Sequence, residues 1–297
     1  MTVTLVILFN HQYNHNLPKL RQLYAARFSS IQFIVPFYTG TDDDVIAVYE
    51  HSFQFQGYIA QATRQLLQLA ATHYLIIGDD VLLHPSINEH TYSKHFGLVS
   101  SHTNFVPSLT PIHTITRNWQ PMLNALQLNR SLKGVEVTHI LPSYEQAIAL
   151  FQAQNLVFRN KASFKASFSG KNIVHLIPTL IKKKLAKKPL LRYDYPLAMS
   201  YSDVLVVSSG TLPLFAQYCG IWASLGLFVE FAIPTALILA STSTIITEAQ
   251  LPQKGLTLWH AQDEAILHPY KHSLEALQQH FNADWLYIHP IKLSKWK

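Results

Sequence analysis

The sequence predicts an α/β fold in which a mostly parallel central sheet is flanked by helices. Apolar, β-branched runs at residues 2–9, 31–37 and 73–77 have the pattern of strands that are buried on both faces. Segments with the apolar spacing of amphipathic helices lie between these runs. Strands that alternate with helices in this way indicate parallel crossover connections.

The first strand ends at Asn10, and a polar loop then leads to Pro18. Residues 17–28 have apolar side chains every three or four positions, which predicts an amphipathic helix. The second strand, residues 31–37, is followed by an acidic turn at residues 39–44. Because ligands gather outside the carboxyl ends of parallel strands, we expect the acids of this turn to lie there together with Asn10.

The rest of the chain is expected to complete one continuous domain with two halves, residues 1–130 and 131–297. Residues 57–71 predict a second long helix, and residues 143–154 and 273–281 also have helical patterns. Residues 89–131, between the first and second of these helices, are rich in His, Thr, Asn and Pro and lack clear periodicity, which predicts long loops around a site.

A membrane span has to be weighed at residues 219–240, a stretch long enough to cross a bilayer. Its one charged residue, Glu230, lies near the middle, four residues before Pro234. A carboxylate at bilayer depth is costly, and a proline removes a helix hydrogen bond. The sequence therefore favours two buried helical segments over a span.

The composition favours a folded protein with anionic partners. Lysine and arginine outnumber acids by 23 to 17, and much of the excess lies in residues 182–188, which begin with Lys182 and end with Lys188. This run predicts either peripheral contact with an anionic membrane or a solvated charged segment, and it has no interleaved aromatic residue to indicate nucleic-acid binding.

The single cysteine, Cys219, and an N-terminus without a basic signal segment predict a cytoplasmic location.

Two adjacent carboxylates, Asp79 and Asp80, follow the strand at residues 73–77 and the glycine at position 78. An apolar strand cannot solvate them, so they need a cation or a structural role as a cap. Hard divalent ions take oxygen ligands from one or two carboxylates and complete their shell with substrate phosphates. A metal site and an N-cap for the following turn are therefore the two interpretations of this pair.

The first hundred residues resemble the nucleotide-sugar-binding half of a GT-A glycosyltransferase. The resemblance lies in the strand that ends at Asn10, the acidic turn that contains Asp42, and the strand that leads into Gly78, Asp79 and Asp80. Gly78 stands where the first acid of the family's DxD motif is usual. The resemblance implies that Asp80 holds Mn²⁺ or Mg²⁺, that Asp79 contacts ribose or the metal shell, and that Asn10 and Asp42 contact the nucleotide.

The C-terminal residues 287–296 are similar to a segment that supplies a further metal ligand and pyrophosphate contacts in some GT-A enzymes. By this resemblance His289 is a metal ligand, and Lys292 and Lys295 bind the diphosphate. A basic tail on the surface is the alternative, and His260 is a weaker rival ligand.

Two acids of the second half are candidates for a general base that takes the proton of an attacking acceptor hydroxyl. Glu230 has apolar neighbours in the sequence, which would raise its pKa toward a useful range. Asp203 precedes an apolar strand, residues 204–207, that could present it at the sheet. The structural alternatives are an internal hydrogen-bonded acid for Glu230 and a turn cap for Asp203.

The resemblance implies a bacterial enzyme that transfers a hexose from a UDP-sugar to a glycan acceptor of capsule or lipopolysaccharide, with galactose, as pyranose or furanose, as one option. The first half would bind the donor, and the second would bind an oligosaccharide or lipid-linked acceptor. A metal-dependent nucleotidyltransferase is one alternative, although residues 10–16 contain neither the glycine nor the lysine of its phosphate loop. A non-enzymatic glycan-binding or scaffold protein is the other.

Overall fold

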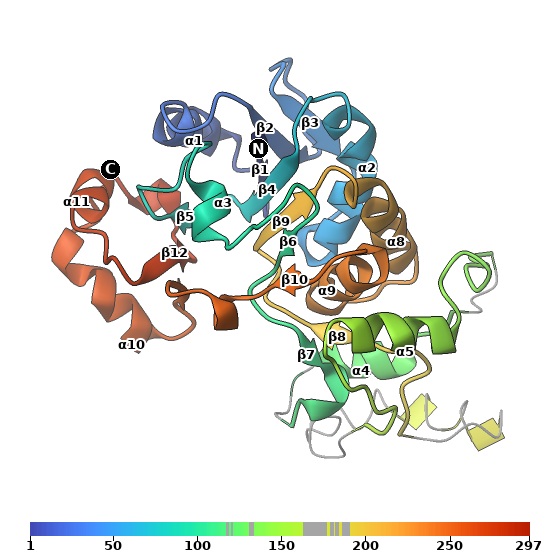
Figure 1. Ribbon diagram of the computed structural model, residues 1–297. Coiled ribbons are helices and arrows are strands. Elements are labelled where there is room, and N and C mark those ends of the chain that lie inside the picture. Colours follow the sequence, from blue (N-terminus) through green and yellow to red (C-terminus); the bar gives the residue numbers. More distant parts are fainter. Residues whose placement is uncertain are drawn as a thin grey trace.

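The α/β prediction is confirmed by the computed structural model, which describes residues 1–116, 119, 121–130, 134–162, 177–178, 181, 184–185 and 191–297. Over these ranges the strands form one seven-stranded sheet and two small sheets. Helices cover both faces of the large sheet (Figure 1). The C-terminal segment and the strand β5 form a separate layer on one side of it.

The large sheet has the order β10-β6-β9-β4-β1-β2-β3. Its strands are β1 Val3–Leu8, β2 Ile31–Pro36, β3 Val45–Val48, β4 His73–Gly78, β6 Asn104–Phe105, β9 Val204–Ser208 and β10 Ile245–Ile246. Only β9 among these strands runs against its neighbours, and the other six share one direction. The beginning of β9 therefore lies at the same edge as the carboxyl ends of β1 and β4.

The alternation of side chains along β1 explains why both faces of the sheet are covered. Val6 and Leu8 belong to the core on the side of α2, α8 and α9, whereas Leu5 and Ile7 belong to the core on the side of α1. These helices span α1 Leu17–Tyr24, α2 Phe55–Leu66, α8 Leu212–Ser224 and α9 Val229–Ala240. The central strands are thus buried on both faces, as the sequence predicts.

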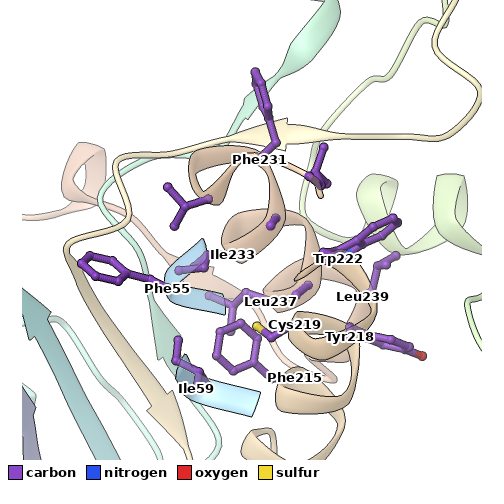
Figure 2. Packing of buried hydrophobic residues seen from close by; sticks show 14 of the residues in the cluster. Phe55, Ile59, Phe215, Tyr218, Cys219, Trp222, Phe231, Ile233, Leu237 and Leu239 are labelled. Atoms are coloured by element: carbon purple, nitrogen blue, oxygen red, sulfur yellow. The ribbon is translucent and has the colours of Figure 1, made fainter. Parts of the chain in front are cut away.

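The apolar stretch at residues 219–240 is divided between α8 and α9, which confirms the prediction of two buried helices. In the ranges that the structure describes, none of the helices has the length and apolar character needed to cross a membrane. Figure 2 shows Ile59 of α2, Cys219 of α8 and Leu237 of α9 gathered in one apolar cluster. The stretch is apolar because it fills this core.

Pro234 lies inside α9 and positions another part of the chain. Its nitrogen carries no hydrogen, so the Glu230 carbonyl lacks the helix donor four residues on. The Ser200 backbone N–H donates to that carbonyl instead, at 3.0 Å. One turn further, the Thr235 hydroxyl accepts from the Ala198 N–H at 3.1 Å. The helix thereby holds the segment that leads into β9.

The small sheet β11-β12-β5 brings the C-terminal segment beside the large sheet. Its central strand β12 pairs in parallel with β11 and antiparallel with β5, which follows β4 after a short turn. The bounds are β5 Leu82–Leu83, β11 Lys254–Thr257 and β12 Trp285–His289, with the short helices α10 Ala261–Glu264 and α11 Leu274–Gln279 nearby. The end of β12 is therefore close to the end of β4.

The prediction for residues 89–131 is only partly right, because this region supplies regular elements as well as loops. It contains α3 Tyr92–His95, β6, β7 Thr110–Pro111 and α4 Pro121–Gln127. The two-residue strands are too short to show a period in the sequence. The later helix is α5 Tyr144–Ala153, and β7 pairs with β8 Ala198–Met199.

The two expected halves share the central sheet, since residues 131–297 supply β9 and β10. Their functional division at residue 130 stays a prediction. Most of the basic run 182–188, and with it the expected membrane contact, lies outside the described residues, which include only Lys184 and Leu185 of the run.

Candidate metal centre

Three side chains from distant parts of the sequence meet at one edge of the sheet. Asp80 follows β4, Asp203 precedes β9 and His289 ends β12. One ligand atom of each lies within 4.8 Å of the others. Asp203 reaches this edge because β9 is antiparallel to β4, with Val204 paired to Ile77.

The Asp80 carboxylate divides its two oxygens between different neighbours. Its Oδ2 accepts from the Asn10 side-chain amide at 3.2 Å. Its Oδ1 lies 3.2 Å from His289 Nε2 but is buried without a hydrogen-bond partner in the described parts of the chain. The contact with His289 is therefore an ion-pair contact and not an aligned hydrogen bond, which leaves this oxygen available to a cation.

The absence of a side chain at Gly78 allows the two carboxylates to approach. A Cβ at this position would lie 2.9 Å from Asp80 Oδ1 and 3.3 Å from Asp203 Oδ1. The Gly78 N–H also donates to the Asp203 carbonyl at 2.9 Å, which fixes the two strands relative to each other. A larger residue would therefore push on both acids.

The electrostatics of the cluster favour an added positive charge. The pKa of Asp203 is raised to about 6, mainly by burial; His289 opposes this shift and the Asp80 carboxylate adds to it. Burial, with a contribution from Asp80, raises the pKa of Asp79 to about 7. For His289, burial lowers the pKa, but the carboxylates of Asp80, Asp203 and Asp79 together outweigh this and leave it raised. Neighbouring buried acids cannot all ionise comfortably unless a cation compensates them.

The residues present fit a divalent metal ion. The cluster offers two carboxylates and one imidazole. This donor set suits Mn²⁺, and its carboxylates also suit Mg²⁺, which prefers oxygen ligands. The unpartnered Asp80 oxygen and the space above Gly78 provide a ligand atom and room for the ion. Asp80 and His289 are thus brought together as expected, and Asp203, expected as a base, joins them.

A cavity of about 390 Å³ opens beside this cluster. Asp79 and Asp80 form one part of its wall, and Lys292 and Lys295 line another. The Ile291 N–H donates to the Asp80 carbonyl at 2.7 Å, which holds the segment that carries these lysines next to the candidate metal ligands. A cavity lined by both carboxylates and lysines suits a ligand that combines a divalent cation with phosphate groups.

The C-terminal turn that carries these lysines is held in place by Lys19. Its ammonium donates to the Leu293 carbonyl at 2.9 Å and to the Trp296 carbonyl. Lys19 lies on α1, so the turn is fixed against the large sheet and its helices. The segment is therefore part of the fold and not a free surface tail.

Asn10 and Asp79 connect the ends of the two central strands. The Asn10 backbone N–H donates to Asp79 Oδ1 at 3.0 Å, and Asp79 is buried. β1 has β2 on one side and β4 on the other, so the strand order reverses at this point. Ligands of open α/β sheets bind outside such a reversal, which is where the cavity lies.

The expected placement of Asp42 is wrong. Asp44 precedes β3, and its carbonyl accepts from Phe33 near the beginning of β2, so the acidic turn lies toward the amino ends of the strands. Asp42 and Asp44 both form ion pairs there with Arg21 of α1, at 2.8 and 2.6 Å. The chain returns from β2 to β3 without an intervening helix, which carries the turn away from the cavity.

Glu230 does not join the metal cluster. It lies in the first turn of α9 and is half-buried. The rival ligand His260 caps α10, where the Asp263 side chain accepts from the His260 N–H at 2.9 Å.

Two aromatic residues at the centre were missed by sequence reasoning. The Tyr201 ring lies 4.9 Å from the His289 ring, and its buried hydroxyl has no hydrogen-bond partner in the regions that the structure describes. The Trp259 ring lies 5.5 Å from that of His289 and is 57 % exposed. The only signal was their position next to the candidates Asp203 and His260.

No protein-family model matches the chain, and no curated protein matches it at a significant level. Among solved structures, it is similar to 2-C-methyl-D-erythritol 4-phosphate cytidylyltransferase from Thermus thermophilus, with 10% identity, 91% of this chain and 99% of that chain covered, and a TM-score of 0.36. It is also similar to the mannosyltransferase Ktr4p from S. cerevisiae in complex with GDP, with 11% identity, coverage of 81% and 66%, and a TM-score of 0.33. Similarity at this level assigns neither family nor activity.

Proposed function

We propose that this chain is a metal-dependent glycosyltransferase that moves a hexose from a UDP-sugar to a glycan acceptor. The observation that carries the proposal is the meeting of Asp80, Asp203 and His289 beside a cavity lined by Lys292 and Lys295. A nucleotide-sugar donor presents a diphosphate that needs both a divalent cation and further positive charge as it departs. A cap or a scaffold would not need this combination.

Asp80, Asp203 and His289 would hold Mn²⁺ or Mg²⁺. When bound, the ion would neutralise charge that develops on the diphosphate leaving group. Lys292 and Lys295, which line the same cavity, would contact the phosphates. Asn10 would orient Asp80 through its side-chain amide, while Asp79 fixes the Asn10 backbone.

Glu230 is the proposed base that takes the proton of the acceptor hydroxyl. Asp203 is better suited to the metal, because it lies with Asp80 and His289. The first turn of α9 contacts the segment before Asp203, since Ser200 donates to the Glu230 carbonyl and Ser202 to the Val229 carbonyl. This packing supports a position for Glu230 near the metal centre.

The remaining features of the proposal concern the biological setting. The acceptor would be an oligosaccharide or lipid-linked glycan of a bacterial surface polysaccharide, with galactose as one option for the sugar. The basic run 182–188 would bring the enzyme to the cytoplasmic face of an anionic membrane.

Titration calorimetry of UDP in the presence and absence of Mn²⁺ tests the proposal. We expect nucleotide binding that requires the metal and that is lost in Asp80→Asn, while Asp284→Asn, a change at an exposed turn residue, leaves binding unchanged. Hydrolysis of donors from a panel of nucleotide sugars then identifies the sugar. Metal-independent UDP binding, or no binding, would contradict the proposal. Pyrophosphate release from a nucleoside triphosphate would replace it with nucleotidyl transfer.

A further inference from the structure

We propose that a second cavity, between the β3–α2 loop, α4 and the turn that joins α8 to α9, binds sugar rings of the acceptor. The name acceptor rests on the proposed function, but the binding of a glycan does not. The cavity has a volume of about 750 Å³, within the range of about 300–1,000 Å³ that is typical of ligand pockets. It is separate from the cavity at the metal centre.

Aromatic rings line this second cavity. The rings of Phe53 and Phe228 lie 6.2 Å apart, and Trp119 lies 5.5 Å from Phe228. Phe53 is 66 % exposed although it is a large apolar side chain. An exposed aromatic cluster in a cavity indicates a ligand with an apolar face. The C–H face of a pyranose ring meets this requirement.

A polar atom in the wall distinguishes a sugar from a purely apolar occupant. The side-chain oxygen of Gln54 is buried and has no hydrogen-bond partner in the described parts of the chain. Gln54 lines the cavity next to Phe53. A hydroxyl at the edge of a sugar ring can donate to this oxygen, whereas an alkyl chain would leave it unpaired. Aromatic faces beside an unpaired acceptor thus match the amphipathic surface of a sugar.

The wall of the cavity is held rigid by hydrogen bonds to its backbone. The Asn124 side chain donates to the Gly226 carbonyl at 2.7 Å and accepts from the Phe228 N–H at 2.7 Å. The Gln56 side-chain amide donates to the Leu227 carbonyl at 2.8 Å. These bonds fix the turn between α8 and α9, so binding need not order it.

The first turn of α9 connects this cavity to the metal centre. Phe228 caps the helix and lines the cavity, and Glu230 follows two residues later. Ser202, which donates to the Val229 carbonyl at 3.5 Å, directly precedes Asp203. An acceptor bound on the Phe228 side would therefore approach the metal centre past the proposed base.

Glycan binding by the intact protein tests the inference without donor or metal. The labelled protein, with EDTA present, is applied to a glycan array, and the dissociation constant of the strongest glycan is measured by calorimetry. We expect Phe53→Ala and Gln54→Leu each to weaken binding at least about tenfold. Tyr49→Ala is the matched control, because Tyr49 is also a largely exposed aromatic residue but does not line the cavity.

The outcomes separate this inference from the proposed function. Mn²⁺-dependent UDP binding should be unchanged in Phe53→Ala and Gln54→Leu, which also shows that both variants are folded. The inference is overturned if no arrayed glycan binds, if binding does not depend on Phe53, or if decanol competes as well as the glycan does. If the wild-type protein binds a glycan but does not bind UDP, only the proposed function is overturned.

Discussion

Gly78, the last residue of β4, and Asp203, just before the antiparallel strand β9, lie side by side and are joined by a hydrogen bond of 2.9 Å from the Gly78 N–H to the Asp203 carbonyl. A Cβ on residue 78 would lie only 3.3 Å from an Asp203 carboxylate oxygen and 2.9 Å from one of Asp80. The carboxylates of Asp80 and Asp203 can thus lie close together because residue 78 has no side chain.

Gly78→Ala should weaken Mn²⁺ binding about 10- to 100-fold, because the added methyl group displaces two metal ligands. Gly210→Ala is the control, since its Cβ would meet its nearest neighbour, a His102 ring nitrogen, at an ordinary 3.8 Å. Calorimetric titration with Mn²⁺ and a thermal melt measure affinity and folding separately. Equal Mn²⁺ affinity in the two variants would show that the acids do not bind the metal together.

Asp203→Asn distinguishes a metal ligand from a general base. If Asp203 holds the metal with Asp80 and His289, the variant should lose Mn²⁺ affinity as well as turnover. A general base would leave Mn²⁺ and UDP affinity unchanged while turnover falls. Titration of both ligands together with a turnover assay decides between these roles, with Asp284→Asn as a control for the loss of a surface charge.

The stability of the metal-free protein should depend on the ionisation of Asp203. Burial raises the pKa of this carboxyl to about 6, from about 4 in an unfolded chain. The folded state then binds more protons than the unfolded state, so the stability that the protonated acid provides is lost as pH rises from about 4 to 6. The raised pKa of His289 acts in the same direction.

The measurement is the free energy of unfolding of the wild type and Asp203→Asn between pH 4 and 7, with EDTA. The variant lacks the buried charge and should gain stability relative to the wild type as pH rises, by on the order of 3 kcal/mol at pH 7. Saturating Mn²⁺ should reverse the ranking, because it binds the wild type more tightly. If the free energy of unfolding depends on pH in the same way in both proteins with EDTA present, the ionisation of Asp203 is not the cause of the pH dependence.

Lys292→Ala and Lys295→Ala should weaken Mn²⁺-dependent UDP binding, each by roughly tenfold, and should reduce its dependence on salt. Both residues line the cavity together with Asp79 and Asp80, and neither side chain is needed to hold the turn, which is fixed by Lys19. Lys94→Ala, at an exposed position of α3, is the charge-matched control. If the UDP affinity of both variants equals that of the control, Lys292 and Lys295 do not contact the diphosphate.

The local sequence pattern predicts the positions of Asn10 and Asp80. The strands around Asn10 and Asp80 are apolar along their whole length, so a parallel arrangement with both residues at one edge follows from the pattern alone. His289 was expected near the metal only through a resemblance, since nothing local shows that β12 pairs with β5.

The remaining parts depend on pairings between distant segments. Asp203 reaches the metal centre only because β9 runs antiparallel between β4 and β6, and its direction leaves no mark in a short apolar run. The position of Asp42 was mispredicted for a related reason, because the link from β2 to β3 contains no helix and places the acidic turn toward the amino ends of the strands.

Glu230→Gln tests the proposed base, because the change keeps the shape of the side chain and removes its basic oxygen. Turnover should fall by about 10²–10⁴, whereas Mn²⁺ and UDP affinity should stay unchanged, since Glu230 lies outside the metal cluster. The fold should also persist, because α9 is held to Ser200 by the Glu230 backbone carbonyl, which the substitution retains. Glu264→Gln, in the short helix α10, controls for the loss of a charge in a first turn. Full turnover in Glu230→Gln would place the base elsewhere, and a loss of UDP affinity would place Glu230 at the donor instead of the acceptor.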